Sequence, residues 1–384
     1  MKLPRKKVAV QTSIALLVTF LFAYASLLDF LVPVRVSKLD TLLAAVAAND
    51  SIPASCKSFI TRSIAIPLAS DEDSDNVVPR IAHFLHYNQN FTSPRYLCAI
   101  ESFHFQNPDF EISIHVANAV TFMSAIHPWL TQSGLSQHLS IRQIDYSKEM
   151  AETPLEPWYE NGVWKESRWP EQNLGNALRL ALVHNYGGIY LDLDIISLNP
   201  VSAGKRMVAM QDPKSMNNAF LSLEKGDQFA WWLMEEFVRG FKGNIWGRNG
   251  PEVVIRTFNK YCKPKEKAAP KSECKTIKVI PANQIYPFGY RQKHLMFESW
   301  EENCDFLDDM AAKSIGLHWW NKRAKSVEFM SNKTILSVVM QTRCPALFEA
   351  YTDKYLGIDV DAKLGALQLI TEDPELMKPG AKKQ

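Results

Sequence analysis

Apolar and polar positions follow two different periods between residues 77 and 360. Short apolar runs of strand length are separated by longer stretches in which apolar residues recur with a helical period. Because strands that alternate with helices form largely parallel sheets, this order predicts an α/β fold that binds nucleotide at the carboxyl ends of its strands. Strands are predicted at residues 77–85, 110–116, 139–144, 189–191, 207–210 and 275–281, and helices at residues 96–104, before Tyr186, at residues 229–241 and from Pro251 onward. Residues 217–221, which begin with two asparagines, are interpreted as a turn into the next strand.

The clearest pattern lies in residues 173–200, which predict a helix, a turn and a strand. Leu178 and Leu182 mark one apolar face of the helix. Two glycines at 187–188 end it, because glycine adopts the left-handed backbone that a helix C-terminus requires. The apolar residues 189–191 then predict a buried strand.

Two carboxylates stand at the end of this strand. Asp192 and Asp194 are separated by Leu193, so strand alternation predicts that both acidic side chains lie on one face. Two carboxylates in that position form a hard oxygen site for a divalent cation. Such a pair also occurs by chance as solvated carboxylates at a sheet edge. Here apolar residues flank the pair, and burial makes unpaired carboxylates costly.

Residues 177–195, ALRLALVHNYGGIYLDLDI, resemble the sugar-nucleotide-binding core of the α-1,4-glycosyltransferase family. The resemblance covers residues 78–355 and implies a GT-A-like, Rossmann-type single catalytic domain, which we place at residues 77–360. Four later blocks resemble the family in the same order: NNAF at 217–220, IWGRNGP at 245–251, HWWNK at 318–322 and CP at 344–345.

The resemblance also implies roles for individual residues. Asp194, Asp192 and His318 are expected to hold Mn²⁺ or Mg²⁺, which stabilises the charge that develops on a leaving diphosphate. Without the resemblance, a histidine among tryptophans is more often a core residue, and an arginine on a helix face is as often solvated. The residues expected to bind the sugar-nucleotide donor are Asn176, Arg179, Gly188, Tyr190, Asp192, Asn217 and Lys322.

One position departs from the family. The family carries aspartate three residues before the helix arginine, whereas this chain has Asn176. Asparagine keeps the shape and the hydrogen bonding but removes a charge, so the choice of donor sugar stays open. The family retains the anomeric configuration, yet no residue here identifies itself as the nucleophile. Asn217 and Asn249 are weak candidates for the back face of the sugar, and a same-face mechanism assisted by the diphosphate is an equal alternative.

The two ends of the chain predict a membrane-anchored arrangement. Residues 8–28 carry no charge and are long enough to cross a bilayer as a helix, and four cations in residues 1–7 favour a cytoplasmic amino end. A cleaved signal peptide is the alternative, because Ala23 and Ala25 offer small side chains. Residues 29–76 are interpreted as a partly disordered stem, and residues 361–384 as a polar tail.

Sequons and cysteines agree with a lumenal location. Glycosylation is predicted at Asn49, Asn90 and Asn332. All six cysteines follow the apolar segment, which favours disulfides. Cys262 and Cys274 bracket a lysine-rich insert and suit a stapled loop, while the other pairings stay open. The net charge of +2 gives no case for a nucleic-acid partner, and 46% hydrophobic residues suffice for a full core.

Tryptophans gather in the polar segment 154–170. Trp158, Trp164 and Trp169 can stack on the apolar face of a sugar ring if they lie on a loop, or pin that loop by burial. Arg248 and Asn249 lie in a second loop that can face an acceptor.

The sequence therefore predicts a Golgi type II transferase that moves galactose or an N-acetylhexosamine from a UDP-sugar to a glycolipid or glycan in α-1,4 linkage. A mannosyltransferase that uses GDP-mannose shares the same Asp-x-Asp core and is one alternative. A lumenal glycan-binding protein with a degenerate donor site is another, favoured by Asn176.

Overall fold

A computed structural model describes most of the chain after residue 53. No helix in the described ranges is long and apolar enough to cross a membrane. The predicted cytoplasmic tail, anchor and C-terminal tail lie outside those ranges. The described residues are 54–64, 78–91, 93–263, 272–321, 331 and 333–351.

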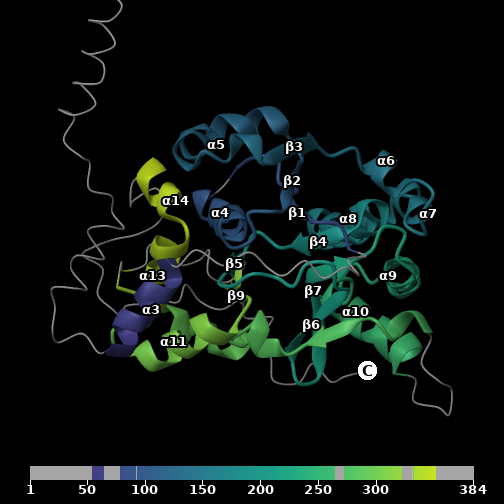
Figure 1. Cartoon of the computed structure of the whole chain (residues 1–384). Helices are drawn as coiled ribbons and strands as arrows, with labels where there is room; N and C mark the ends of the chain where they lie inside the picture. The colour runs from purple at the N-terminus through teal and green to yellow at the C-terminus, as the bar shows by residue number, and fades with distance from the viewer. Residues whose placement is uncertain are drawn as a thin grey trace, which may run out of the picture.

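A seven-stranded sheet forms the centre of the described part (Figure 1). It contains β1 (Ile81–His86), β2 (Glu111–Val116), β3 (Leu139–Gln143), β4 (Gly188–Leu191), β6 (Met207–Asp212), β7 (Ser215–Leu223) and β8 (Lys278–Ile280). The strand order is β3-β2-β1-β4-β7-β6-β8, and β7 alone runs against the other six. The predicted α/β fold with a mainly parallel sheet is therefore confirmed.

Helices cover both faces of the sheet, and the alternation of side chains on each strand decides which core each residue joins. On β4, Ile189 and Leu191 face one core, whereas Tyr190 faces the other. The first core is closed by α3 (Ala54–Ile64), α4 (Leu97–Gln106), α5 (Ala119–Ser133), α11 (Cys304–Lys313), α13 (Ile335–Arg343) and α14 (Pro345–Ala350). The second is closed by α6 (Tyr146–Met150), α7 (Glu156–Glu160), α8 (Pro170–Tyr186), α9 (Gln228–Gly240) and α10 (Pro251–Thr257).

A second sheet pairs two short strands that come from distant parts of the sequence. β5 (Ile195–Ser197) runs antiparallel to β9 (Gly316–His318), with Ile195 opposite His318. Because β5 follows β4 after a short turn, this pairing carries His318 to the end of the central sheet. The strand pairing thus brings together residues that lie more than a hundred positions apart in the chain.

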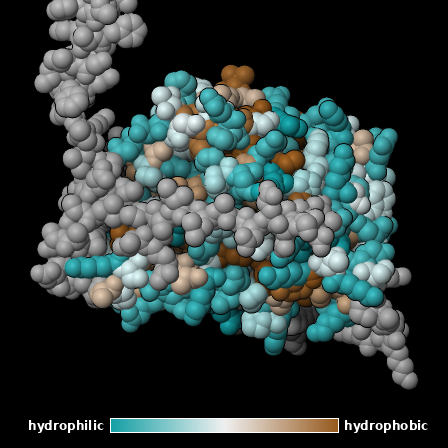
Figure 2. All heavy atoms as spheres, viewed as in Figure 1, coloured by the Kyte–Doolittle hydropathy of each residue, from teal (hydrophilic) through white to brown (hydrophobic). Residues whose placement is uncertain are grey.

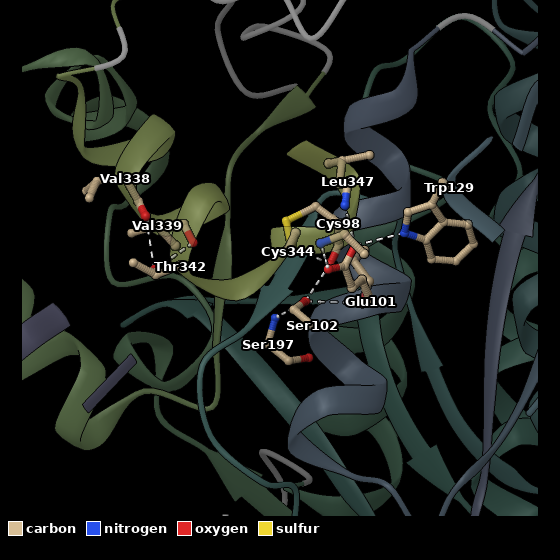
Figure 3. The surroundings of a disulfide bond; sticks show 12 residues. Cys98, Glu101, Ser102, Trp129, Ser197, Val338, Val339, Thr342, Cys344 and Leu347 are labelled. Atoms are coloured by element: carbon tan, nitrogen blue, oxygen red, sulfur yellow. Dashed lines mark hydrogen bonds between the residues drawn. A yellow bond between two sulfur atoms is a disulfide. The ribbon is translucent and has the colours of Figure 1, made fainter. Parts of the chain in front are cut away.

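Helix α4 fixes β5 and α14 from the interior of the first core (Figure 3). The Ser102 hydroxyl accepts a hydrogen bond from the Ser197 backbone N–H at 2.9 Å. One turn earlier, the disulfide of Cys98 with Cys344 joins α4 to the start of α14. Strand β5, which pairs with the strand that carries His318, is therefore held by a helix that is itself joined by a disulfide to the start of α14.

The segment predicted as a stem contains a packed helix. Cys56, Phe59 and Ile60 of α3 are buried, and Cys56 forms a disulfide with Cys304 of α11. In Figure 1 α3 lies beside α11 and α13. The apolar side chains of α3 thus cover the first core, and the fold includes residues that precede the predicted start of the catalytic domain.

Two local predictions have different outcomes. The predicted staple is confirmed, since Cys262 and Cys274 form a disulfide. The predicted turn at Asn217 is wrong, because that residue lies inside β7. The chain reverses earlier, at residues 212–215. The Asp212 side chain accepts hydrogen bonds from the N–H groups of Lys214 and Ser215, and Pro213, which has no N–H, cannot pair in a sheet.

The surface seen in Figure 2 is mainly hydrophilic, with apolar atoms in scattered groups. Scattered exposed apolar residues are normal for a soluble fold, whereas contiguous ones mark binding surfaces. Large exposed hydrophobic side chains in the described part include Val120, Ile245, Trp246, Tyr290 and Phe306.

Candidate active site

Helix α8 and strand β4 place the acidic residues through a turn that only glycine permits. Gly187 and Gly188 have φ of 69° and 101°. A Cβ on Gly188 would lie 2.4 Å from the Ile81 carbonyl oxygen, so a larger residue would push β4 away from β1. Gly188 lies at the opposite end of β4 from Asp192. The close approach to β1 accounts for glycine at this position without any contact to a ligand. We therefore do not place Gly188, which was predicted to bind the donor, in the donor site.

Asp192 and Asp194 lie in a tight turn after β4, whereas the sequence predicted them on the strand itself. The Asp192 N–H donates to the Ala219 carbonyl at 2.9 Å, and the Ile195 N–H donates to the Asp192 carbonyl at 3.1 Å. The turn nevertheless directs both carboxylates to one place. One ligand atom each from Asp192, Asp194 and His318 lie within 4.8 Å of one another. We call these three residues the DXD cluster.

Arg179 supports the cluster from α8. Its guanidinium lies 3.0 Å from an Asp192 carboxylate oxygen, donates to the Asn218 carbonyl at 3.1 Å and stacks 4.8 Å from the centre of the Tyr190 ring. The Tyr190 hydroxyl donates to Asp192 at 2.6 Å. Burial works against the charge of Arg179, but Asp192 raises the pKa of the guanidinium, which therefore stays protonated. Arg179 and Tyr190 thus fix one carboxylate and offset its charge.

Asp194 is held by backbone groups of the segment that carries His318. The Asn321 N–H donates to the Asp194 carboxylate at 2.9 Å, and the Trp319 N–H donates to the Asp194 carbonyl at 2.9 Å. Between them, Trp320 adopts a φ of 53°, which is costly for a bulky residue. Strain of this kind is common at functional sites, where the surrounding contacts impose it.

His318 is neutral in this environment. Burial lowers the pKa of its imidazole to about 4. The Trp320 N–H donates to Nδ1 at 3.2 Å, so the neutral ring carries its proton on Nε2, which lies 3.2 Å from an Asp194 oxygen. Burial also raises the pKa of the Asp194 carboxyl to about 6. A cation at Nε2 would replace that proton, and it would offset the burial that disfavours charge on Asp194.

The structure adds a residue that the sequence pattern did not indicate. Tyr286 is buried, its ring lies 5.1 Å from that of His318, and its hydroxyl has no hydrogen-bond partner among the described residues. After burial, the charges of Asp192 and Asp194 are the next largest causes that raise the pKa of this hydroxyl. Tyr286 follows a short strand with no distinctive polar pattern, so only the packing of β9 brings it to the cluster.

Asn176 occupies the position where the family has aspartate, one turn before Arg179. The Asn218 side-chain amide donates to Asn176 Oδ1 at 3.1 Å. A Cβ on Gly250 would lie 3.0 Å from the same oxygen. An aspartate would offer Asn218 the same acceptor, so the asparagine preserves this contact and changes only the local charge.

Asn217 and Asn249, the two candidates for the back face of the sugar, both have hydrogen-bond partners within the fold. Asn217 bonds to Gln211 at 2.6 Å and accepts from the Ala219 N–H, on the strand next to β4. Asn249 is buried, donates to Asn173 at 3.0 Å and to the Lys242 carbonyl, and accepts from the Lys242 N–H. These bonds use the whole amide of Asn249 and favour a structural role.

The structure describes only some of the remaining predicted residues. Lys322, Asn49 and Asn332 lie outside the described residues, whereas Asn90 is exposed, as a glycosylation site requires. Among the tryptophans, Trp158 is buried on α7 against two phenylalanines and belongs to the core.

Two family models match adjacent parts of the chain. Residues 93–215 match the glycosyltransferase sugar-binding region containing the DXD motif, and residues 222–351 match the α-1,4-glycosyltransferase conserved region. The first match contains Asp192 and Asp194, and the second contains His318. The two matched regions therefore meet in the DXD cluster.

Named relatives agree with these matches. The chain is 28% identical to lactosylceramide 4-α-galactosyltransferase of Pan troglodytes over 266 residues, which covers 67% of this chain and 74% of the relative. It is 28% identical to human α-1,4-N-acetylglucosaminyltransferase over 235 residues, which covers 60% of this chain and 64% of that relative.

Two solved glycosyltransferase structures match the chain with low TM-scores and little shared sequence. The PaToxG glycosyltransferase gives a TM-score of 0.39 at 15% identity and covers 58% of this chain and 79% of its own. The galactosyltransferase LgtC, solved with donor and acceptor sugar analogues, gives 0.33 at 12% identity and covers 68% and 95%. From the two matched regions and the relatives, we conclude that the chain belongs to the α-1,4-glycosyltransferase family.

Proposed function

We propose that the protein is a metal-assisted transferase that moves a hexose or N-acetylhexosamine from a UDP-sugar in α-1,4 linkage, with retention of the anomeric configuration. The observation that carries the proposal is the DXD cluster, in which two carboxylates and one neutral imidazole converge within 4.8 Å. This ligand set suits Mn²⁺ better than Mg²⁺, because Mg²⁺ favours oxygen ligands alone. The family relatives named above are a galactosyl- and an N-acetylglucosaminyltransferase, which supports a hexose donor.

The charge and hydrogen-bonding groups of each residue in the site suggest its role. A cation held by Asp192, Asp194 and His318 would neutralise the charge that develops on the leaving diphosphate. Burial raises the pKa of the Asp192 carboxyl, and the Arg179 guanidinium, which holds that carboxylate in place, works against the rise. The buried Tyr286 hydroxyl is a hydrogen-bond donor beside the cluster and suits a diphosphate or sugar oxygen.

We further propose that the protein acts in the Golgi lumen, on the glycan of a glycolipid or glycoprotein, behind an anchor at residues 8–28. Three disulfides in the described residues support an oxidising compartment. The exposed position of Asn90 fits the same location. An anchored site lies close to the membrane, which suits a lipid-linked acceptor.

The test is calorimetric titration of the whole chain, in detergent, with a panel of UDP-sugars in the presence and absence of Mn²⁺. The whole chain is needed because a protein truncated to begin at residue 77 would lack Cys56, the partner of Cys304. We expect one UDP-sugar to bind only with Mn²⁺. Substitution of a residue that hydrogen-bonds to a metal ligand weakens metal binding by ~10–100-fold, and we expect Asp194→Asn, which changes a ligand itself, to weaken donor binding by more than that.

The matched control is Asp309→Asn, which removes an exposed carboxylate paired with Lys313 on α11. It should leave donor binding unchanged. Mn²⁺-dependent donor binding of Asp194→Asn as tight as that of the wild type would overturn the metal assignment. Selective binding of a GDP-sugar would instead favour the mannosyltransferase alternative, and a folded protein that binds no nucleotide sugar would favour a glycan-binding role.

A further inference from the structure

Tyr87 follows β1 at the edge of the sheet that carries the DXD cluster. The strand order β3-β2-β1-β4 changes direction between β1 and β4, and ligands of open α/β sheets bind outside the carboxyl ends of two such strands. β1 and β4 pair in parallel, with His83 opposite Tyr190. Tyr87 and Asp194 each come four residues after that pair. The two residues therefore leave the sheet at the same edge and at the same level.

The Tyr87 ring packs on α8 at a glycine. Tyr87 contacts the second core, on the face of the sheet that α8 covers. A Cβ on Gly175 would lie 2.9 Å from the ring, so the ring fills the space that a larger residue would need. The Gly175 carbonyl accepts a hydrogen bond from Arg179 at 3.3 Å, one helical turn further along. Glycine is unfavourable inside a helix, and the close contact with Tyr87 accounts for it here.

The Tyr87 hydroxyl has no hydrogen-bond partner among the residues that the structure describes, and its side chain is partly exposed. The neighbouring Tyr190 hydroxyl, by contrast, donates to Asp192 at 2.6 Å. Burial raises the pKa of the Tyr87 hydroxyl, the charge of Asp192 raises it further, and Arg179 works against the rise. Tyr87 therefore offers a protonated hydroxyl beside the cluster, with its hydrogen bond still unmade.

The charges around this hydroxyl favour an anion as the missing partner. Each carboxylate oxygen of Asp192 already accepts a hydrogen bond, one from Arg179 and one from Tyr190. A divalent cation bound at the cluster, together with Arg179, outweighs the charge of the two aspartates, so the loaded site is positive and attracts an anion. A neutral hydroxyl can donate to that anion without adding charge of its own.

We infer that the Tyr87 hydroxyl donates a hydrogen bond to the diphosphate of the nucleotide-sugar donor, and that Gly175 is needed to place it. The inference rests on the proposed transferase function. A diphosphate oxygen suits the hydroxyl better than a sugar hydroxyl does, because hydrogen bonds to charged groups are stronger. The bond strengthens as charge develops on the leaving diphosphate, so Tyr87 would contribute to the rate as well as to binding.

The experiment titrates UDP, uridine and inorganic pyrophosphate into the whole chain with Mn²⁺. Tyr87→Phe removes only the hydroxyl, and we expect the Kd for UDP and for pyrophosphate to rise about 10–100-fold, the range for a hydrogen bond to a charged group. The Kd for uridine, which has no phosphate, should stay within about twofold of the wild type. Urea unfolding without Mn²⁺ or nucleotide should be unchanged, because the hydroxyl has no partner to lose.

Gly175→Ala tests the placement of the ring. The added methyl group should displace Tyr87 and raise the Kd for UDP to a similar degree, although alanine is the better helix former. Because both changes break the same bond, the double variant should bind UDP no more weakly than the weaker single variant, within about twofold. Additive losses would show that Gly175 acts through another contact and would overturn its assigned role.

Tyr186→Phe is the matched control, because Tyr186 ends α8 and its hydroxyl donates to Glu149 at 2.9 Å. It should lower the midpoint of urea unfolding and leave the Kd for UDP unchanged. Unchanged binding of UDP and pyrophosphate in Tyr87→Phe would overturn the inference. An equal rise for uridine would also overturn it, since the hydroxyl would then contact the nucleoside, and so would a rise confined to UDP-sugars, which would place it at the sugar.

Pyrophosphate separates this inference from the proposed function. If Tyr87→Phe weakens the binding of UDP and pyrophosphate but the wild type transfers no sugar, the proposed function fails and Tyr87 stands as a diphosphate-binding residue. If the wild type transfers sugar and neither affinity depends on Tyr87, the proposed function stands and the inference fails. A wild type that binds neither UDP nor pyrophosphate with Mn²⁺ would contradict both.

Discussion

Arg179 shows how a single side chain sets the charge of the candidate site. Its guanidinium is almost fully enclosed, while the Asp192 carboxylate beside it keeps a quarter of its surface exposed. Removal of one partner of a buried ion pair leaves an uncompensated charge and costs about 3–5 kcal/mol. The exposure of Asp192 reduces that cost, since water screens part of its charge.

Arg179→Met should lower the free energy of unfolding by about 2–3 kcal/mol in the absence of a divalent cation. Mn²⁺ should then stabilise the variant more than it stabilises the wild type, because the cation replaces the lost positive charge beside Asp192. Urea unfolding with and without Mn²⁺ measures both effects. An Mn²⁺ increment equal to or below that of the wild type would count against a cation in the DXD cluster.

Arg206→Met provides the comparison for this experiment. Arg206 forms an enclosed ion pair with Asp227, with Nε 2.8 Å from the carboxylate. Its loss should destabilise the protein by about 3–5 kcal/mol, since Asp227 is almost fully enclosed and water does not screen its charge. It should leave the Mn²⁺ increment unchanged because Asp227 is not part of the cluster. The two variants therefore separate an effect on the cation from a general loss of stability.

At the level of residues, the sequence indicated the candidate metal ligands better than their surroundings. The resemblance placed Asp192, Asp194 and His318 in one site, and the structure brings them together. Tyr286 was missed because it contacts His318 only through folding, and nothing in its local pattern marks it. Asn249 was proposed for the sugar, but its amide is used by its own loop. Hydrogen-bond partners of this kind depend on the loop conformation, which residue types alone do not specify.

At the level of elements, Glu101 on α4 holds two other helices in place (Figure 3). Its carboxylate accepts hydrogen bonds from the Trp129 indole at 2.8 Å and from the N–H groups of Ala346 and Leu347 at 2.7 and 3.0 Å. The first belongs to α5, and the other two are at the start of α14, where helix N–H groups lack partners within the helix. Burial raises the pKa of the Glu101 carboxyl to about 7, although these donors limit the rise.

The raised pKa predicts how the wild type and Glu101→Gln differ with pH. A carboxyl whose pKa is higher in the folded state stabilises the protein below pH 4.5 and loses that contribution as pH rises through 7. We expect this contribution to be about 3 kcal/mol in the wild type and absent in Glu101→Gln. The measurement is the difference in unfolding free energy between the two proteins from pH 4.5 to 8. A difference that does not vary with pH would refute the assignment.

The comparison with Glu101→Gln is necessary because a histidine pair in the sheet acts in the opposite direction. His83 on β1 and His115 on β2 lie 3.2 Å apart, and burial lowers the pKa of His83 to about 4 and that of His115 to about 3. Each histidine is neutral in the folded state and gains a proton on unfolding below pH 6.5, so this pair stabilises the protein as pH rises. Both proteins contain the pair, and its contribution cancels in the difference.

The elements themselves were largely predictable, because periodicity reflects burial. The strands at β1, β2 and β4 and the helix α8 follow the predicted apolar runs, with ends that shift by a few residues. The error at Asn217 arose because asparagine favours turns in general, whereas Asp212 and the proline after it form the turn here. The small sheet of β5 and β9 could not be predicted, since each strand has three residues and its partner is distant in sequence.

At the level of the whole molecule, two disulfides join nearly the same two regions of the chain. Cys56 is bonded to Cys304, and Cys98 is bonded to Cys344, at sequence separations of 248 and 246. The sequence left these pairings open because cysteine positions alone do not determine connectivity. In the unfolded chain, the shortest covalent path between the two cysteines of one bond runs through the other bond. The loop that either bond closes is therefore much shorter while the other bond is intact.

This arrangement predicts that the two bonds are not additive in stability. With Cys98–Cys344 intact, the path from Cys56 to Cys304 through that bond is roughly a third of the direct path, and loop-closure entropy grows with the logarithm of the path length. Paired serine substitutions at either bond should each cost about 2–4 kcal/mol. Removal of both should cost about 1 kcal/mol more than the sum, because the second removal opens the full loop. Urea unfolding of the three variants gives the coupling.

The disulfide of Cys262 with Cys274 distinguishes this entropic coupling from a general loss of packing. It closes a separation of only 12 residues and barely shortens the path between Cys56 and Cys304. Serine substitutions at this third bond should therefore add to those at Cys56 and Cys304 without an excess. An excess of equal size in both combinations would show that the coupling arises from weakened native packing and not from the unfolded chain. A coupling confined to the two long bonds would show that each of them shortens the loop that the other closes in the unfolded chain.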